Sequence, residues 1–277
     1  MLKTPKASIL IVTYNSGKYI KNTLKSCLNQ NYDNFNILIL DNNSTDWTPE
    51  YIESLKKKKI ILYKSKENLW PYKGLNYLLD KTKAEYIAIQ DHDDIFHPNK
   101  LKETISFLDK NPDYVWCGHN MLVYFEKDKN WYIFRIQQQN NVMHTSLVFR
   151  NKWFRYRDND NMYLEDLYFQ RKILSESGKI WNINKVLWFH LIKENKNNLS
   201  SNWWKLNIKD IKKFFDIYWY WKYWIQVFIV TLLKKTFPTF FYKIERKVLN
   251  KKYWVLSLEN LLKYENIKIL LDNFYNK

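Results

Sequence analysis

The stretch Ile87-Ala88-Ile89-Gln90-Asp91-His92-Asp93-Asp94 passes from a short apolar strand into three carboxylates within four residues. Carboxylates this close together repel one another, so a positive group must neutralise them or their pKa values must rise. A divalent cation bound to a phosphate would do so, because Mg²⁺ and Mn²⁺ prefer hard oxygen ligands. The alternative is a solvated acidic turn that caps a helix starting near Pro98. We favour the metal site.

Length, charge and cysteine content limit the class of protein. The 277 residues, 46% of them hydrophobic, suffice for one large domain or for a domain with an appendage. The net charge of +17 favours an anionic partner, either nucleic acid, a phosphorylated substrate or an anionic membrane. Cys27 and Cys117 lie in apolar surroundings, so we expect reduced core residues of a cytoplasmic protein. The first residues offer no apolar segment typical of a signal peptide.

Strand and helix patterns alternate along the first two-thirds of the chain. The predicted strands are residues 8–13, 36–40, 60–63 and 85–90, and the predicted helices are residues 18–29, a segment opening at Thr48, and residues 73–81. This order predicts an α/β fold with a mainly parallel central sheet flanked by helices. Ligands of such sheets bind beyond the carboxyl ends of the strands. Because Thr13, Asp41 and Asp91 all end strands, we expect them at one edge of the sheet.

Asp41 ends a buried strand and opens the polar loop Asn42-Asn43-Ser44-Thr45-Asp46. An Asx turn, with Asp46 or Thr48 capping the next helix, explains the later part of this loop. It does not explain why a carboxylate should end a buried strand. Such a carboxylate can accept a hydrogen bond from a base or a ribose, as acids at strand ends do in nucleotide-binding folds. Ligand binding and a structural role therefore stay equally open for Asp41.

Five segments, in their order and spacing, make the chain resemble the family 2 glycosyltransferases, which have the GT-A fold. They are Ser8-Ile-Leu-Ile-Val-Thr-Tyr-Asn15, Asp41-Asn-Asn-Ser-Thr-Asp46, Glu67-Asn68 with Lys73-Gly74-Leu75-Asn76, Asp91-His-Asp-Asp94, and Leu164-Glu165-Asp166. The resemblance spans roughly residues 7 to 195. It implies an inverting enzyme that moves a sugar from a nucleoside diphosphate donor, a UDP-sugar or a dTDP-sugar, to a hydroxyl of a glycan or lipid-linked acceptor.

The resemblance also implies the donor site. Thr13 and Tyr14 would line the nucleobase pocket, and Asp41 would accept from the base. The other donor-binding residues that it implies are Asn43, Asn68, Lys73 and Asp91. Asp91 resembles the first acid of the DxD motif, near the ribose and the metal, and Asp93 would ligate Mn²⁺ or Mg²⁺ directly. The metal would bridge the two phosphates and offset the charge that grows on the leaving diphosphate.

Glu165 and Asp166 resemble the acidic pair that carries the catalytic base of the family. Asp166 would take the proton of the acceptor hydroxyl as that hydroxyl attacks the anomeric carbon, and it must come within hydrogen-bond reach to do so. Alternatively, both acids lie in the first turn of a helix over residues 164–175 and stabilise its dipole. With the upstream motifs present, we favour the catalytic base.

Further candidates lie where the chain departs from the family pattern. Trp70 stands where the family usually has glycine, and it could stack on or shield a ligand. His190 lies in an apolar strand, so a buried core histidine is the simpler interpretation. Alternatively, His190 or Lys193 could approach the diphosphate in place of the family's usual cationic residues. His144, just before an apolar run, is a candidate for a contact with the acceptor.

The composition changes near residue 201, which predicts a catalytic domain over residues 1–200 and a helical, basic and aromatic extension over residues 201–277. Residues 217–233 are almost wholly apolar, but Lys222 and Gln226 interrupt them. Aromatic and cationic side chains together are typical of a membrane interface, which would place the protein on the inner membrane face. A helix packed on the catalytic domain or in a dimer, and a true span, remain alternatives. The sequence does not predict the oligomeric state.

Two other classes of function compete with the transferase. Basic and aromatic residues of the extension could bind single-stranded nucleic acid, although the acidic loop argues against nucleic acid at that face. A sugar nucleotidyltransferase would share the fold and the metal chemistry, but it would release pyrophosphate. The sequence does not name the sugar, the acceptor or the linkage.

Overall fold

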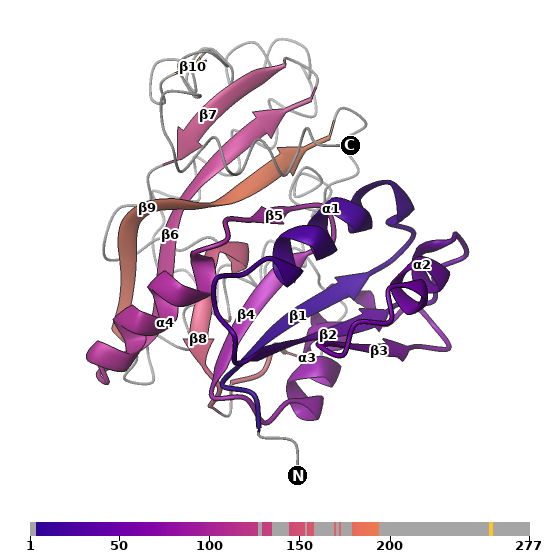
Figure 1. Cartoon of the computed structure of the whole chain (residues 1–277), viewed down its shortest axis with the longest axis horizontal. Helices are drawn as coiled ribbons and strands as arrows, with labels where there is room; N and C mark the ends of the chain where they lie inside the picture. Colours follow the sequence, from indigo (N-terminus) through magenta and orange to yellow (C-terminus); the bar gives the residue numbers. More distant parts are fainter. Residues whose placement is uncertain are drawn as a thin grey trace, which may run out of the picture.

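A mixed sheet of ten strands organises the part of the chain that the structure describes (Figure 1). The computed structural model describes residues 4–126, 129–134, 144–152, 154–157, 169, 172, 179–193 and 255–256. The strand order is β10-β7-β6-β8-β4-β1-β2-β3, with β9 paired to β6 and β5 paired to β9. The strands are β1 (Ala7–Thr13), β2 (Phe35–Asp41), β3 (Ile60–Lys64), β4 (Tyr86–Asp91), β5 (Ile95–Phe96), β6 (Tyr114–Phe125), β7 (Asn130–Phe134), β8 (Val148–Arg150), β9 (Lys179–Ile192) and β10 (Val255–Leu256).

The first four strands form the parallel half of the sheet, and each was predicted from the sequence. β1 lies in the middle and pairs in parallel with β2 and β4, while β2 pairs in parallel with β3. The register places Thr13 opposite Asp41 and Val12 opposite Asp91. The carboxyl ends of β1, β2 and β4 therefore meet at one edge, as predicted.

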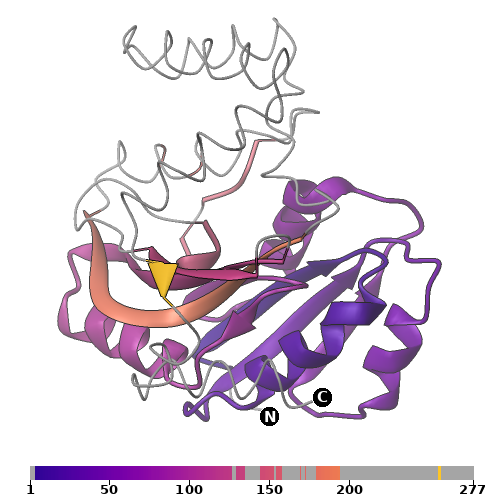
Figure 2. The ribbon, with the colours of Figure 1, turned by 90° about the horizontal axis from the view of Figure 1, so that it is seen from above.

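Helices cover both faces of this parallel half (Figure 2). The helices are α1 (Gly17–Leu28), α2 (Thr48–Ser54), α3 (Trp70–Lys81) and α4 (Lys100–Lys110). Alternate residues of a strand face opposite sides, so the isoleucines of β1 and β2 share one core with α1, α2 and α4. The leucines at the intervening positions share a second core with α3. Burial on both faces explains why these strands are continuous apolar runs.

The second half of the sheet is mixed. β8 pairs antiparallel with both β4 and β6, and β6 forms an antiparallel hairpin with β7. β9 runs parallel to β6 and also pairs with β5, the short strand that follows the acidic loop. Cys27 and Cys117 are free and buried, as expected.

The predicted extension lies almost wholly outside the described residues, as do residues 217–233. Its two described residues form β10, which pairs antiparallel with Trp131 and Tyr132 of β7. Within the described ranges, no helix is both long and apolar enough to cross a membrane. The division at residue 200 and the membrane interface stay predictions.

Candidate donor and metal site

Three aspartates after β4 gather in one acidic cluster, which consists of Asp91, Asp93 and Asp94. One carboxylate oxygen of each lies within 4.8 Å of those of the other two. Asp91 ends β4, and the other two lie in the loop that leads into β5. Oxygen atoms at this spacing are donors that Mg²⁺ and Mn²⁺ prefer, so the cluster fits a divalent cation by the chemistry of its ligands.

Asp94 is fully buried, and donors from β9 surround its carboxylate. Trp188 Nε1 donates at 2.9 Å, His190 Nδ1 at 2.9 Å and the backbone nitrogen of Leu191 at 3.2 Å. Burial raises the pKa of Asp94, but three donors favour its anionic form. Its carboxylate is thus engaged in joining the acidic loop to β9. A cap on the helix near Pro98 is not its role, because Asn99 is the N-cap residue of α4.

His190 is held as a cation by this arrangement. Burial alone would lower its pKa, but the Asp94 carboxylate outweighs burial and raises the pKa to about 9. The ion pair leaves His190 14% exposed at its side chain. His190 is therefore neither a neutral core histidine nor an exposed group, and it supplies positive charge beside the acids.

Asp93 has a different partner. Its Oδ2 lies 2.6 Å from Lys193 Nζ, and both side chains are about one-tenth exposed, at 10% and 9%. Burial disfavours its charge, but His92 and Lys193 outweigh burial and lower the pKa of Asp93. Asp93 is therefore an anion beside a cation, and its side chain still reaches solvent.

Asp91 is exposed to solvent at the end of β4, but neighbouring protein groups displace water from its carboxylate. This desolvation and the carboxylates of Asp94 and Asp93 raise its pKa, although His190 and Lys193 oppose the rise. A cation bound at the cluster would remove the repulsion that raises this pKa. The pair best placed to hold a metal is therefore Asp91 and Asp93, because Asp94 is already fully hydrogen-bonded.

Trp188 is a site residue that the sequence analysis did not identify. Alternate residues of a strand point to the same face, so Trp188 and His190 both reach Asp94 from β9. The sequence did contain a signal for this role: a tryptophan, whose ring N–H can donate, lies two residues before a histidine in an apolar strand. Which loop that face meets could not be read from the sequence, because 94 residues separate Asp94 from Trp188.

Asp41 ends β2 with a side chain that is 3% exposed. Its Oδ2 accepts from the backbone nitrogen of Ser44 at 3.1 Å, whereas its Oδ1 is buried and has no hydrogen-bond partner among the described residues. A buried acceptor without a partner is unfavourable unless a ligand or a water satisfies it. A structural role in the turn accounts for Oδ2 of Asp41, whereas Oδ1 is available to a ligand.

The rest of the Asp41 loop is tied to the start of α1. Asp46 accepts from the backbone nitrogens of Gly17 and Thr48, each at 3.0 Å. Burial alone would raise the pKa of Asp46, but the hydrogen bonds outweigh burial and lower it. The Asx turn at Asp46 is confirmed, so this acid has a structural role. The expected cap by Asp46 or Thr48 is wrong, because Trp47 is the N-cap residue of α2 and no side chain caps the helix. Asn43 is exposed in the same loop, with a positive φ of 67°.

The residues that follow β1 differ in exposure. Thr13 is fully buried, and its hydroxyl bonds to the hydroxyl of Ser16. Tyr14, directly after it, is 45% exposed. At this edge Thr13 therefore shapes the turn, while Tyr14 offers an accessible ring.

A hydrogen-bonded bridge joins the loop after β2 to the start of α3. Asn68 Oδ1 accepts from Asn42 Nδ2 at 2.8 Å and from the backbone nitrogen of Trp70 at 3.0 Å. Asn42 Oδ1 in turn accepts from the backbone nitrogen of Leu69 at 2.9 Å. This bridge places the first turn of α3, which includes Lys73, next to the loop that follows Asp41.

His144 lies in η1 (His144–Ser146), a short 3₁₀ turn before β8. Its Nε2 is hydrogen-bonded to the hydroxyl of Tyr156, and its ring packs on Tyr72 of α3 with centroids 5.9 Å apart. Burial lowers its pKa to about 4, so the ring is neutral. The predicted contact of His144 with an acceptor stays a prediction. Glu165 and Asp166 lie outside the described residues.

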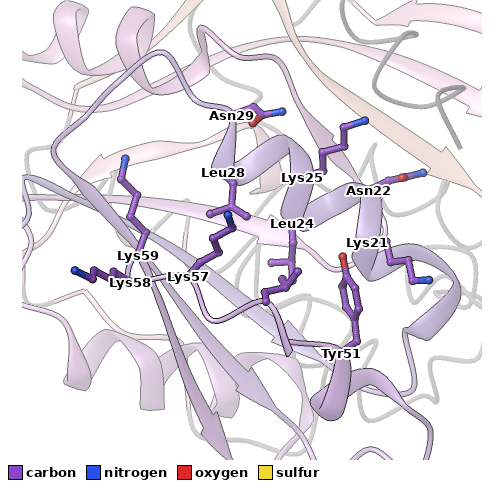
Figure 3. A pocket seen from close by; sticks show the side chains of 11 residues that line it. Lys21, Asn22, Leu24, Lys25, Leu28, Asn29, Tyr51, Lys57, Lys58 and Lys59 are labelled. Carbon is purple, nitrogen blue, oxygen red and sulfur yellow. The ribbon is translucent and has the colours of Figure 1, made fainter. Parts of the chain in front are cut away.

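A second concavity lies between α1 and the turn before β3, in a groove of about 570 Å³ (Figure 3). Five lysines line it around a floor formed by leucines and Tyr51. The lysines are Lys21, Lys25, Lys57, Lys58 and Lys59, and the leucines are Leu24, Leu28 and Leu55. We call it the lysine groove.

Comparisons with known sequences agree with this architecture. The model of the glycosyl transferase family 2 matches residues 8–181. An uncharacterized glycosyltransferase of Haemophilus influenzae is 31% identical over 130 residues, which are 46% of this chain and 40% of the relative. One of Methanocaldococcus jannaschii is 26% identical over 278 residues, which cover 90% of this chain and 95% of the relative. The chain spans less than half the length of the first relatives that it matches.

Solved structures share the fold. Residues 1–349 of S. aureus TarS in complex with UDP superpose with a TM-score of 0.58 at 20% identity, covering 68% of this chain and 61% of that one. The complex of the same fragment with UDP-GlcNAc gives the same TM-score of 0.58 and covers 59% of that chain. The likeness supports a GT-A-like fold, as the sequence resemblance implied. The match to the family model covers more than half of the residues of this chain, which therefore belongs to glycosyl transferase family 2.

Proposed function

We propose that this chain is an inverting glycosyltransferase that moves a sugar from a UDP-sugar, or a dTDP-sugar as second choice, to a hydroxyl of a glycan or lipid-linked acceptor. One observation carries the proposal: a buried carboxylate oxygen of Asp41 without a partner among the described residues and the acidic cluster lie at the same edge of the sheet. The family and the TarS complexes with UDP and UDP-GlcNAc support it.

The free oxygen of Asp41 suits a pyrimidine base. Uracil and thymine both carry an imide N–H, and a carboxylate oxygen accepts a hydrogen bond from such a group. Desolvation of an unpartnered carboxylate oxygen is unfavourable, so a base that fills this position removes that cost. In this proposal Tyr14 lies beside the base, and Asn43, Asn68 and Lys73 lie near the nucleotide.

The acidic cluster would hold Mn²⁺ or Mg²⁺ through Asp91 and Asp93. When bound, the cation supplies charge that stabilises the leaving diphosphate. His190 and Lys193 add two positive charges beside the same acids, and in this proposal they contact the diphosphate. Asp94 positions His190 and orients the loop, which is the supporting role that a residue behind the ligands usually has.

The chemical step needs a base on the acceptor side, and Asp166 is our candidate, with Glu165 beside it. The acceptor oxygen forms a bond to the anomeric carbon while the bond from that carbon to the diphosphate oxygen breaks. The hydroxyl proton goes to the Asp166 carboxylate, and the electron pair of the broken bond stays on the diphosphate. Attack from the side opposite the leaving group inverts the anomeric configuration.

The first test is a calorimetric titration of the full chain with UDP, dTDP and GDP, each with and without Mn²⁺. We expect UDP or dTDP to bind and Mn²⁺ to strengthen the binding. Equal weak binding of all three nucleotides, independent of metal, would contradict the donor site. Release of pyrophosphate from a sugar phosphate and a nucleoside triphosphate would instead identify a sugar nucleotidyltransferase.

Asp166→Asn tests the base separately. We expect kcat to fall by about 10²- to 10⁴-fold, because a general base typically contributes that much. The affinity for UDP should stay unchanged, since this carboxylate meets the acceptor and not the nucleotide. Near-normal transfer by the variant would show that another group takes the proton.

A further inference from the structure

Trp70, the first residue of α3, combines two unfavourable features. Its φ is 63°, in the left-handed region that favours glycine and penalises a side chain. Its side chain is 51% exposed, the highest value among the exposed large hydrophobic residues of the described part. Neither the backbone nor the core therefore accounts for a tryptophan here. Strained non-glycine residues are held where the surroundings determine them, often at ligand sites.

The surroundings that hold Trp70 belong to the donor edge. Its backbone nitrogen donates to Asn68 Oδ1, which also accepts from Asn42, the residue after Asp41. Pro71 follows and disfavours the ordinary right-handed helical conformation at position 70. The chain thus fixes an indole ring in a strained conformation next to the loop that carries the free carboxylate oxygen.

Resting on the proposed donor site, we propose that the indole of Trp70 stacks on the nucleobase that Asp41 recognises. A carboxylate fixes the edge of a pyrimidine but leaves its two faces open to solvent. Aromatic rings stack on such faces regardless of the identity of the base, and each ring contributes substantially to affinity. Asp41 then selects the base, and Trp70 strengthens its binding.

The test measures the affinity of the full chain for UMP and UDP in the presence of Mn²⁺ by calorimetry. Trp70→Gly removes the ring and relieves the backbone, so both affinities should fall, by about fivefold to a hundredfold. The thermal midpoint should not fall, because glycine favours this φ. Trp70→Phe keeps an aromatic ring and should retain most of the affinity.

Lys56→Gly is the matched control, because Lys56 also has a positive φ, 46°, and lies between α2 and β3. We expect it to leave nucleotide affinity unchanged. Wild-type affinity in Trp70→Gly would overturn the inference while leaving the donor site intact. Loss with UDP-GlcNAc but not with UMP would place the ring on the sugar and would also overturn it. Absence of nucleotide binding by the wild type would overturn the donor site itself, and the inference with it.

The lysine groove carries a second, independent inference. Its five lysines form no salt bridge with a carboxylate among the described residues, and no acid lines the groove. Two of them lie over aromatic rings instead, Lys21 over Trp47 at 5.0 Å and Lys59 over Phe35 at 3.9 Å. Figure 3 shows the side chains of Lys57, Lys58 and Lys59 around one end of the groove. Such a concentration of like charge attracts an anion.

We propose that the lysine groove docks on an anionic phospholipid surface. Its basic rim suits lipid phosphates, and its apolar leucine floor suits the region just below the headgroups. A nucleic acid would meet few stacking partners there, since Tyr51 is the single aromatic residue among the described residues that line the groove. Docking here would bring the catalytic sheet to the membrane independently of residues 201–277.

The test is cosedimentation of the full chain with phosphatidylcholine vesicles, with and without phosphatidylglycerol. We expect binding only to the anionic vesicles. The triple variant Lys57→Gln, Lys58→Gln and Lys59→Gln should bind them about a hundredfold more weakly, given the contribution of each lysine near an anionic surface. The control carries the same charge change at exposed lysines elsewhere, Lys83→Gln, Lys102→Gln and Lys110→Gln. Equal losses in both variants, or unchanged binding of the first, would overturn the proposal.

Discussion

At the residue scale, each aspartate of the acidic cluster has a different environment. Asp94 is buried and receives three donors, and Asp93 is paired with Lys193 and reaches solvent. Asp91 is mainly desolvated and is also repelled by the other two carboxylates. Three residues of one type therefore divide into a positioning group and two candidate ligands. The environment of each carboxylate, and not its identity, sets that division.

Asp93→Asn should weaken UDP binding in the presence of Mn²⁺ and lower kcat/KM by at least about a hundredfold, because a ligand to the metal is lost. Binding of UDP without metal should change little. Calorimetry with and without Mn²⁺ separates the two effects. A variant whose response to Mn²⁺ equals that of the wild type would exclude Asp93 as a ligand.

Asp94→Ala should lower the free energy of unfolding by about 3–5 kcal/mol, since His190 would be left as a buried cation without its partner. Urea denaturation measures this change. Lys81→Ala, an exposed change at the end of α3, is the control and should stay within about 0.5 kcal/mol of the wild type. A small effect at Asp94 would mean that its ion pair contributes little.

At the element scale, the close approach of α3 to the sheet depends on Gly74. A Cβ added there would lie 3.0 Å from both methyl groups of Val12 and 3.1 Å from Leu40 Cδ2. The helix packs on β1 and β2 through this position, and its first turn carries Trp70 and Lys73. The same contact that fixes α3 therefore fixes one wall of the candidate donor site.

Gly74→Ala should destabilise the fold by about 1–3 kcal/mol, because an extra methyl group forces the well-packed interface apart. UDP affinity should fall as well, since the first turn of α3 moves with the helix. Thermal unfolding and calorimetry on one preparation measure both. Improved stability would indicate that α3 has room for a side chain, with the helix propensity of alanine then dominating.

At the scale of the whole molecule, Lys100 ties α4 to the mixed half of the sheet. It is fully buried on α4, and its Nζ donates to the carbonyl oxygen of Thr145 in η1 at 2.8 Å. The same Nζ lies 3.5 Å from the centroid of the Phe96 ring in β5. Burial lowers its pKa well below 10.5, while Cys27, Asp94 and Asp91 oppose the shift.

This lowered pKa predicts how stability depends on pH. Between the lowered pKa and 10.5 the unfolded chain binds one more proton than the folded chain, so stability rises with pH in that window. Compared with Lys100→Met, the wild type should become progressively more stable as the pH increases toward 10.5. Urea denaturation at several pH values gives the difference. A constant difference would show that Lys100 keeps its ordinary pKa.

Local patterns were sufficient for the parallel half of the fold. The apolar runs that became β1 to β4 and the helical spacing of α1 and α3 needed no partner to be recognised. The acidic loop and the end of β2 were also placed correctly, because parallel strands bring their carboxyl ends together. The mixed half was less accessible, since the β6–β9 pairing joins distant segments.

The sequence by itself determined the alternation of strands and helices, the family, and the edge at which Thr13, Asp41 and Asp91 meet. These features follow from periodicity and from short motifs, which act over a few residues. Only the tertiary structure decided that Asp94 faces His190 and that Trp70 has a left-handed conformation. Both depend on contacts between distant segments or on a backbone angle, and residue type alone specifies neither.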